Sequence, residues 1–140
     1  MAITGYDHLV VRVNDIDQGI STYRDTLGLE LDRTDENAHL GIKQAFFNLP
    51  NGGFIEIVSP LSEESAVGKA LAGRGEGMHT IAFEVDDLDA TCTAMKEGGA
   101  QLIGEGGPQV SVHPQSTRRS VLQPSATRHA GDARRQSAAE

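Results

Sequence analysis

Residues Gly77–Leu88 read GMHTIAFEVDDL, and the earlier stretch Tyr6–Ile16, YDHLVVRVNDI, repeats the same pattern. Apolar residues alternate in both stretches up to Val-x-Asp, after which come an apolar residue and a second Asp. Aligning the copies places Asp15 on Asp87. Alternation with a period of two is typical of a half-buried strand, and Asp is a favoured helix N-cap. Each copy therefore predicts a strand that leads directly into a helix.

The segments that follow the two copies also correspond. We expect a helix over residues 17–27 and another over 89–97, closed by glycine at Gly28 and at Gly98–Gly99. The Asn-Gly pair at residues 51–52 favours a tight hairpin. Short runs between turn residues predict three strands after each helix: 29–34, 42–49 and 54–58 in the first half, and 101–103, 109–113 and 120–123 in the second.

This repetition predicts an α+β fold of two βαβββ modules, residues 5–58 and 78–123, in one domain over residues 1–123. A linker over residues 59–77 carries a short helix near 63–71. Two such modules can place their sheets side by side as one curled mixed sheet with a central cleft. Residues 124–140 hold almost nothing that could be buried, so we expect a disordered tail there.

Composition limits the class of partner and compartment. The formal net charge is −8, with 20 acidic and 12 basic residues, which argues against nucleic acid or an anionic membrane as a partner. Cys92 is the single cysteine, so no intrachain disulfide can form. No segment has the composition of a signal peptide or the length of a membrane span. A cytoplasmic protein is expected.

Two polar residues in apolar strands are candidates for chemistry. Glu56 stands between Ile55 and Ile57, and a carboxylate in an apolar strand usually has a partner. His8 lies in the first repeated strand, where the alternative is an ordinary half-buried histidine. A histidine and a carboxylate on strands of a duplicated fold point to a metal site.

The chain resembles a known superfamily over residues 3–117. The stretches that carry the resemblance are DHLVV (7–11), YRDTLGLEL (23–31), IEIVSPL (55–61), SAVGKALAGRGEGMHTIAFEVDDL (65–88) and VHPQST (112–117). They are similar to the vicinal oxygen chelate superfamily of glyoxalases, bleomycin-resistance proteins and extradiol dioxygenases. The RGEGMHxIAFEVDD run is the most specific of them and is similar to the methylmalonyl-CoA epimerases.

The resemblance implies one divalent metal in the cleft. Carried over position by position, its ligands fall on His8, Glu56, Thr80 and Gln123. The family has a second histidine where this chain has Thr80, and usually glutamate where it has Gln123. An imidazole, a carboxylate and an amide oxygen suit Co²⁺ or Mn²⁺, with Mg²⁺ and Zn²⁺ as alternatives.

His79 is not expected to replace the missing histidine. Alternation turns Thr80, Ala82 and Glu84 toward the cleft, whereas His79 points with Ile81 into the helix-facing core. A slip of one residue would bring His79 to the cleft, but it would also expose the apolar side chains of the same strand.

By the same resemblance, the protein is a metal-dependent isomerase that epimerises the α-carbon of a 2-carboxyacyl-CoA, such as methylmalonyl-CoA, through an enolate. Inversion needs acid/base groups on both faces of that carbon. The candidates are Glu56, Gln44 and Glu84. Some relatives keep a catalytic glutamate near Gln44, whose amide cannot abstract a proton. For Glu84 the alternative is an ion pair with Arg12, its counterpart in the first copy.

Two other functions stay open. One is a different lyase or tailoring reaction on the same scaffold, and the other is a metal-free protein of the bleomycin-resistance type that sequesters a small molecule. A binding protein has no need for both His8 and Glu56, whereas a chelating enzyme does. The partner is then a small-molecule substrate, an acyl-CoA in the first reading. The resemblance also implies a homodimer, with Phe46, Phe47 and Phe54 as candidate apolar contacts.

Overall fold

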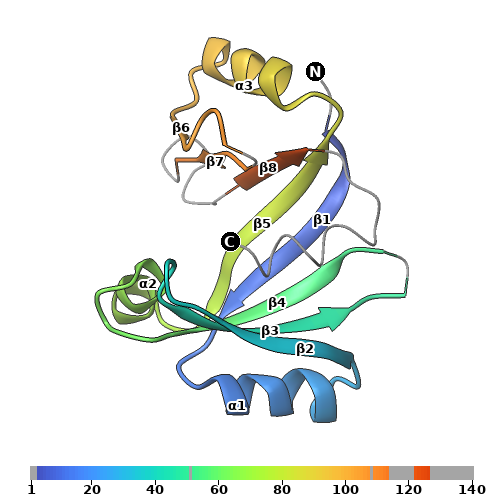
Figure 1. Cartoon of the computed structure of the whole chain (residues 1–140), viewed down its shortest axis with the longest axis vertical. Coiled ribbons are helices and arrows are strands. Elements are labelled where there is room, and N and C mark those ends of the chain that lie inside the picture. The colour runs from blue at the N-terminus through green and yellow to red at the C-terminus, as the bar shows by residue number, and fades with distance from the viewer. Residues whose placement is uncertain (1–2, 51, 108, 114–121, 127–140) are drawn as a thin grey trace. The chain divides into compact units, whose positions relative to one another are not determined.

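The computed structural model describes residues 3–50, 52–107, 109–113 and 122–126 (Figure 1). The fold is α+β, as predicted. The elements in chain order are β1 (Ile3–Arg12), α1 (Ile16–Ile20), the π-helix η1 (Ser21–Thr26), β2 (Glu30–Asn37), β3 (Ile42–Asn48), β4 (Phe54–Pro60), α2 (Ala66–Arg74), β5 (Gly77–Val85), α3 (Leu88–Glu97), β6 (Leu102–Ile103), β7 (Ser111–Val112) and β8 (Leu122–Ala126). None of the helices in this described part is both long and apolar enough to cross a membrane.

The strands of the two modules are arranged in the same order. Neighbouring strands run β1-β4-β3-β2 in the first module and β5-β8-β7-β6 in the second. β3 is antiparallel to both β2 and β4, whereas β8 is parallel to β5, so parallel and antiparallel pairs both occur. This common order is what a duplicated βαβββ module predicts.

The chain divides into two compact units, and the division cuts through β1 and β5. One unit holds residues 3–8, 80–107, 109–113 and 122–126, and the other holds residues 9–79, where only residue 51 is not described. Each unit is described separately below. The longer unit contains α1, η1, the strands β2, β3 and β4, and α2.

Both predicted N-caps form. The Asp15 side chain accepts hydrogen bonds from the backbone N–H groups of Asp17 and Gln18, at 2.8 and 3.1 Å. The Asp87 side chain accepts one from Ala90 at 2.9 Å. These bonds satisfy N–H groups that have no partner inside the helix. The repeated Val-x-Asp pattern therefore fixes where both helices begin.

The longer unit buries apolar side chains on both faces of its strands. On one face, α1 and η1 cover a cluster formed by Val13, Ala45, Phe47 and Ile57. On the other face, α2 contributes Val67 to a cluster with Val10, Ile42 and Val58. The α1 cluster includes Tyr23 at its edge, with its ring 5.9 Å from that of Phe47.

Gly19 brings α1 close to the strands. A Cβ at this position would lie 2.9 Å from Ile57 Cγ2 and 3.0 Å from Val13 Cγ2, which is closer than side-chain atoms pack. The helix would have to move outward to accept any side chain here. Leu27, which directly follows η1, is 59% exposed.

Several element boundaries differ from the predictions. The linker helix begins three residues later than predicted, because the Ser65 hydroxyl accepts the N–H of Gly68 at 3.0 Å and so caps it. β2 continues past the predicted end to Asn37, paired with β3. The last predicted strand, 120–123, continues through Pro124 to Ala126 beside β5. Residues 120–121 and the rest of the predicted tail, 127–140, lie outside the described residues.

The predicted dimer contacts are wrong. Phe46, Phe47 and Phe54 are 1%, 0% and 3% exposed within this one chain, so they are core residues and not surface contacts. Their rings fill the space above and below the strands, which the strand alternation alone did not reveal.

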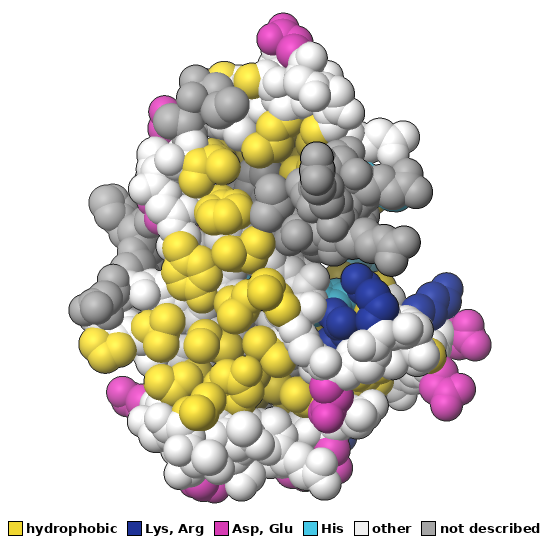
Figure 2. Space-filling model, turned by 180° about the vertical axis from the view of Figure 1, so that it is seen from behind, with side chains coloured by type: hydrophobic (Ala, Val, Ile, Leu, Met, Phe, Trp, Pro, Cys, Tyr) yellow, Lys and Arg dark blue, Asp and Glu magenta, His cyan; other side chains and the backbone are white. Residues whose placement is uncertain are grey.

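On the surface, basic side chains gather in one part of the face in Figure 2, while acidic side chains are scattered around its edge.

Candidate functional site

A buried amide–carboxylate pair lies at the centre of the longer unit. Gln44 on β3 faces Val58 across the β3–β4 ladder, and Phe46 faces Glu56. Side chains on paired strands share a face and reach their diagonal neighbours, which brings Gln44 and Glu56 together. Gln44 Nε2 donates to Glu56 Oε1 at 2.5 Å, and the two residues are only 2% and 6% exposed. The carboxylate that the sequence singled out thus has a specific partner.

The oxygen of the Gln44 amide is not satisfied. Gln44 Oε1 is buried and accepts no hydrogen bond from any described residue. A buried acceptor without a donor costs about 1–3 kcal/mol, and such groups are uncommon in native structures. A donor N–H or O–H, or a cation, would remove that cost. The pair therefore offers a ligand two kinds of acceptor, the carboxylate of Glu56 and the neutral amide oxygen of Gln44.

A row of three side chains runs across the strands beside this pair. Arg33 on β2 faces Phe46, which in turn faces Glu56. The Arg33 Cζ atom lies 4.1 Å from the centre of the Phe46 ring, a cation–π contact, and its Nη1 donates to Asp32 at 3.1 Å. The Phe54 ring lies 6.0 Å from that of Phe46. Aromatic packing thus fixes the apolar wall next to Glu56.

His8 is held by a neighbouring carboxylate in the shorter unit. Its Nδ1 lies 2.6 Å from Asp7 Oδ2, and the residue is 4% exposed. A carboxylate on one ring nitrogen fixes the tautomer and the ring orientation, as is usual for histidines that bind metals through the other nitrogen. This arrangement fits the predicted ligand role and was not visible in the sequence pattern, although Asp7 precedes His8 directly.

His79 and Thr80 differ in their surroundings. Thr80 is 8% exposed, in line with a position that faces inward. Burial, followed by the charges of Arg12 and Arg74, lowers the pKa of His79 from 6.5 to about 4. The imidazole is therefore neutral at physiological pH, but two nearby arginines make its position unfavourable for a metal cation. This supports the expectation that His79 does not replace the missing ligand.

Arg12 is bonded to backbone carbonyls within the longer unit. Its Nε donates to the carbonyl of Gly75 at 2.8 Å and its Nη1 to that of Met78 at 2.6 Å. The two carbonyls lie where α2 ends and β5 begins, a contact that the symmetry of the duplicated strands does not predict. Glu84 is half-buried, and its backbone carbonyl accepts a hydrogen bond from the Thr4 hydroxyl at 3.1 Å.

The predicted site residues are therefore divided between the two units. The structure brings Gln44 and Glu56 together in one unit, and His8, Thr80, Glu84 and Gln123 belong to the other. In β8 the backbone of Gln123 lies opposite Ala82 of β5. Within the described residues, no group of three or more His, Cys, Asp or Glu side chains gathers around a common point. Of the four predicted ligands, only His8 and Glu56 are of these types.

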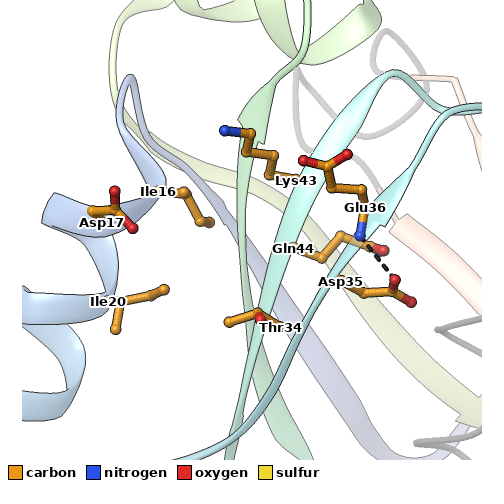
Figure 3. A pocket seen from close by; sticks show the side chains of 8 residues that line it. All are labelled: Ile16, Asp17, Ile20, Thr34, Asp35, Glu36, Lys43 and Gln44. Carbon is orange, nitrogen blue, oxygen red and sulfur yellow. Dashed lines mark hydrogen bonds between the residues drawn. The ribbon is translucent and has the colours of Figure 1, made fainter.

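A cavity of about 270 Å³ in the longer unit has Gln44 of this pair among its lining residues (Figure 3). Ile16 and Ile20 of α1 face Thr34 and Lys43 across it. Thr34 pairs with Ala45, which is buried under α1, whereas Glu56 shares a face with Val58, which is buried under α2. Glu56 itself does not line the cavity, so Gln44 is the residue that the cavity and the pair have in common.

Comparisons with known proteins agree with the fold and identify related enzymes. Residues 7–115 match the family model of the glyoxalase/bleomycin resistance protein/dioxygenase superfamily. The ethylmalonyl-CoA/methylmalonyl-CoA epimerase of Cereibacter sphaeroides is 33% identical over 108 residues, 76% of this chain and 80% of that protein. The lactoylglutathione lyase of Haemophilus influenzae is 36% identical over 101 residues, 72% and 73% of the two chains.

Solved structures show the same relationship. The methylmalonyl-CoA epimerase of Mycobacterium tuberculosis superposes with a TM-score of 0.80 at 30% identity, covering 94% of this chain and 93% of that one. A glutamate-to-glutamine variant of the Streptomyces coelicolor epimerase, in complex with 2-nitronate-propionyl-CoA, gives 0.79 at 28% identity and covers 91% of this chain and all of that one.

Proposed function

The chain belongs to the glyoxalase/bleomycin resistance protein/dioxygenase superfamily, and we propose that within it the chain is an isomerase that epimerises the α-carbon of a 2-carboxyacyl-CoA such as methylmalonyl-CoA. The observation that carries the proposal is the buried Gln44–Glu56 pair, because an ionisable side chain is kept in an apolar strand with an unsatisfied amide oxygen beside it. Likeness to epimerase structures with acyl-CoA ligands supports the substrate class.

The donor set fits a divalent cation. His8, Glu56, Thr80 and Gln123 would hold it in the cleft of the curled sheet that the two modules are predicted to form, and the unsatisfied Gln44 oxygen is a further neutral donor beside Glu56. Co²⁺ or Mn²⁺ suits these oxygen and nitrogen donors, with Mg²⁺ and Zn²⁺ as alternatives. A bound cation would supply Lewis-acid stabilisation of the negative charge that develops on the substrate oxygens.

The residues of the chain have separate tasks in this proposal. The Gln44 N–H orients the Glu56 carboxylate, and the Phe46 and Phe54 rings exclude water from its side. Asp7 orients the His8 ring through Nδ1, so that Nε2 would be the atom that binds the cation. Since Gln44 cannot abstract a proton, Glu84 is the proposed acid/base group on the opposite face of the reacting carbon.

The test is exchange of the α-proton. The purified protein, stripped with EDTA and reloaded with Co²⁺, is incubated with methylmalonyl-CoA in D₂O, and deuterium at the α-carbon is followed by NMR. We expect incorporation by the wild type and loss of at least about 100-fold in Glu56→Gln. Glu64→Gln, which changes an exposed carboxylate of the linker, is the matched control. No exchange by the loaded wild type would overturn the proposal.

A second function has its own support. The Haemophilus influenzae lactoylglutathione lyase is as similar to this chain as the epimerases are. Formation of S-lactoylglutathione from the hemithioacetal of methylglyoxal and glutathione, measured on the same preparation, separates the two reactions. Binding of an acyl-CoA without either reaction would point to a sequestering protein.

A homodimer remains part of the proposal, with different contacts from those first expected. Val11, Leu29, Leu31 and Ile55 are half-buried at the edge of the α1 cluster. Apolar side chains at such an edge are candidates for contact with a second copy. Light scattering coupled to gel filtration gives the oligomeric state, and Leu31→Glu should shift a dimer toward monomer.

A further inference from the structure

A cluster of basic groups lies where α2 ends and β5 begins, apart from the Gln44–Glu56 pair. Arg12 is 5% exposed, and its Nε and Nη1 donate to the carbonyls of Gly75 and Met78. A guanidinium has five N–H groups, so two bonds leave its remaining donors for another acceptor. The bonds to the two carbonyls hold the Arg12 guanidinium against the connection between α2 and β5.

A second arginine, Arg74, directly precedes Gly75, whose carbonyl Arg12 bonds. Arg74 is exposed in the last turn of α2, and burial, followed by the charge of Arg74, lowers the pKa of Arg12. Neither arginine forms an ion pair with a carboxylate in the described part of the chain. The nearby Glu76 accepts the N–H of Asn14 at 3.0 Å. Figure 2 shows basic side chains gathered beside a histidine on the side where α2 lies.

Arg12 is buried, so an anion beside it would offset the cost of keeping its charge away from water. His79 directly follows Met78, whose carbonyl Arg12 bonds, and its Nδ1 is buried without a hydrogen-bond partner among the described residues. Two arginines and this unsatisfied ring nitrogen are thus brought to the end of α2. The bond from Arg12 to the Gly75 carbonyl explains the position of Arg12 at the end of α2. It does not explain why Arg74 is placed there as well.

We propose that Arg12, Arg74 and His79 form an anion-binding subsite for a phosphate group of the ligand. The assignment rests on the proposed function for the identity of that ligand, an acyl-CoA, whose phosphates lie at the far end of its pantetheine arm from the reacting carbon. Guanidinium groups bind phosphate through paired charge-assisted hydrogen bonds, and they keep their charge when buried.

The subsite lies on the same face of the strands as Glu56. Val10 and Val58 pack together under α2. Since side chains alternate along a strand, Arg12 shares the face of Val10, and Glu56 shares that of Val58. The subsite and Glu56 therefore lie on the same face of the strands, on which α2 covers Val10 and Val58.

The experiment measures binding of coenzyme A by titration calorimetry to the wild type and to Arg74→Gln. Because Arg74 is exposed, the substitution leaves the core intact. We expect a loss of affinity of about tenfold, equivalent to roughly 1.4 kcal/mol. Lys69→Gln removes the same charge from an exposed position of the same helix and should change the affinity less than twofold. Equal effects of the two substitutions, or none, would overturn the subsite.

Two further probes identify what the subsite recognises. Propionyl-pantetheine, which has the thioester arm without the nucleotide phosphates, should bind the wild type and Arg74→Gln equally. If inorganic phosphate binds at Arg74 but does not compete with coenzyme A, the subsite takes free phosphate and its assignment to acyl-CoA is wrong. If coenzyme A affinity depends on Arg74 and no α-proton exchange occurs, the subsite stands and the proposed reaction fails.

Discussion

The Gln44 amide donates a hydrogen bond of 2.5 Å to the Glu56 carboxylate, while its own buried oxygen accepts none from the described residues. The two residues are twelve positions apart in sequence and meet because β3 and β4 pair in a hairpin with Phe46 opposite Glu56. With glutamine at position 44, Glu56 is the one titratable group of the pair.

Gln44→Glu should create a proton-sharing dyad. Two carboxylates at this separation cannot both ionise, so the pair should titrate with one apparent pKa well above the usual range for Glu. We expect faster α-proton exchange than in the wild type, rising with pH as the dyad loses its shared proton. The measurement is the pH dependence of deuterium incorporation into methylmalonyl-CoA.

Gln44→Met is the control for this prediction, since it keeps the volume of the side chain and supplies neither charge nor donor. An exchange rate in Gln44→Glu no higher than in Gln44→Met, with both proteins folded, would mean that position 44 does not lie at the reacting carbon.

Thr80→His should strengthen metal binding. It supplies the histidine that the family resemblance implies at this position, which is 8% exposed and thus shielded from water. We expect affinity for Co²⁺ to rise by about 10- to 100-fold, the usual scale for changes around a metal site. Elemental analysis and the visible absorption of Co²⁺ measure it. Thr80→Val should bind no more tightly than the wild type, and a similar gain in Thr80→Val would contradict a ligand role.

Acidification should destabilise the fold through His79. Its pKa is about 4 in the folded chain against 6.5 for an exposed histidine. Between these values the unfolded chain binds a proton that the folded chain does not, so stability falls as the pH drops from 6.5 toward 4. The expected loss is roughly 1–3 kcal/mol. Urea unfolding at a series of pH values measures it.

His79→Gln should remove most of this pH dependence, because the glutamine does not titrate in the range. His39→Gln, at an exposed position, should leave the dependence unchanged. A slope that survives in His79→Gln would assign it to other groups.

Gly19→Ala should destabilise the longer unit by roughly 1–3 kcal/mol, because the added Cβ meets Ile57 and Val13 under α1. Gly73→Ala adds the same methyl group to α2, where nothing lies within 4 Å of the new atom. A helical glycine-to-alanine change without a clash should stabilise by up to about 1 kcal/mol. Thermal unfolding of the two variants should therefore shift in opposite directions, and a neutral Gly19→Ala would show that α1 does not pack as closely as described.

Local features of the chain were predictable because their causes are local. Asp15 and Asp87 cap the helices that follow them through bonds to N–H groups two or three residues away, and alternating residues mark the strands on either side. The repeat of that pattern predicted a duplicated module, and the strand order is β1-β4-β3-β2 after the first copy and β5-β8-β7-β6 after the second. Glu56 was recognised because a carboxylate in an apolar strand needs a partner.

The identity of that partner depended on the tertiary structure. The β3–β4 register determines which diagonal neighbour reaches Glu56. The β2–β3 pairing places Arg33 against the buried Phe46. Arg12 likewise bonds backbone carbonyls of the α2–β5 connection, because a buried guanidinium bonds the acceptors that packing brings to it. Periodicity specifies the face of each strand, whereas hydrogen-bond partners on that face are decided by which segments pack together.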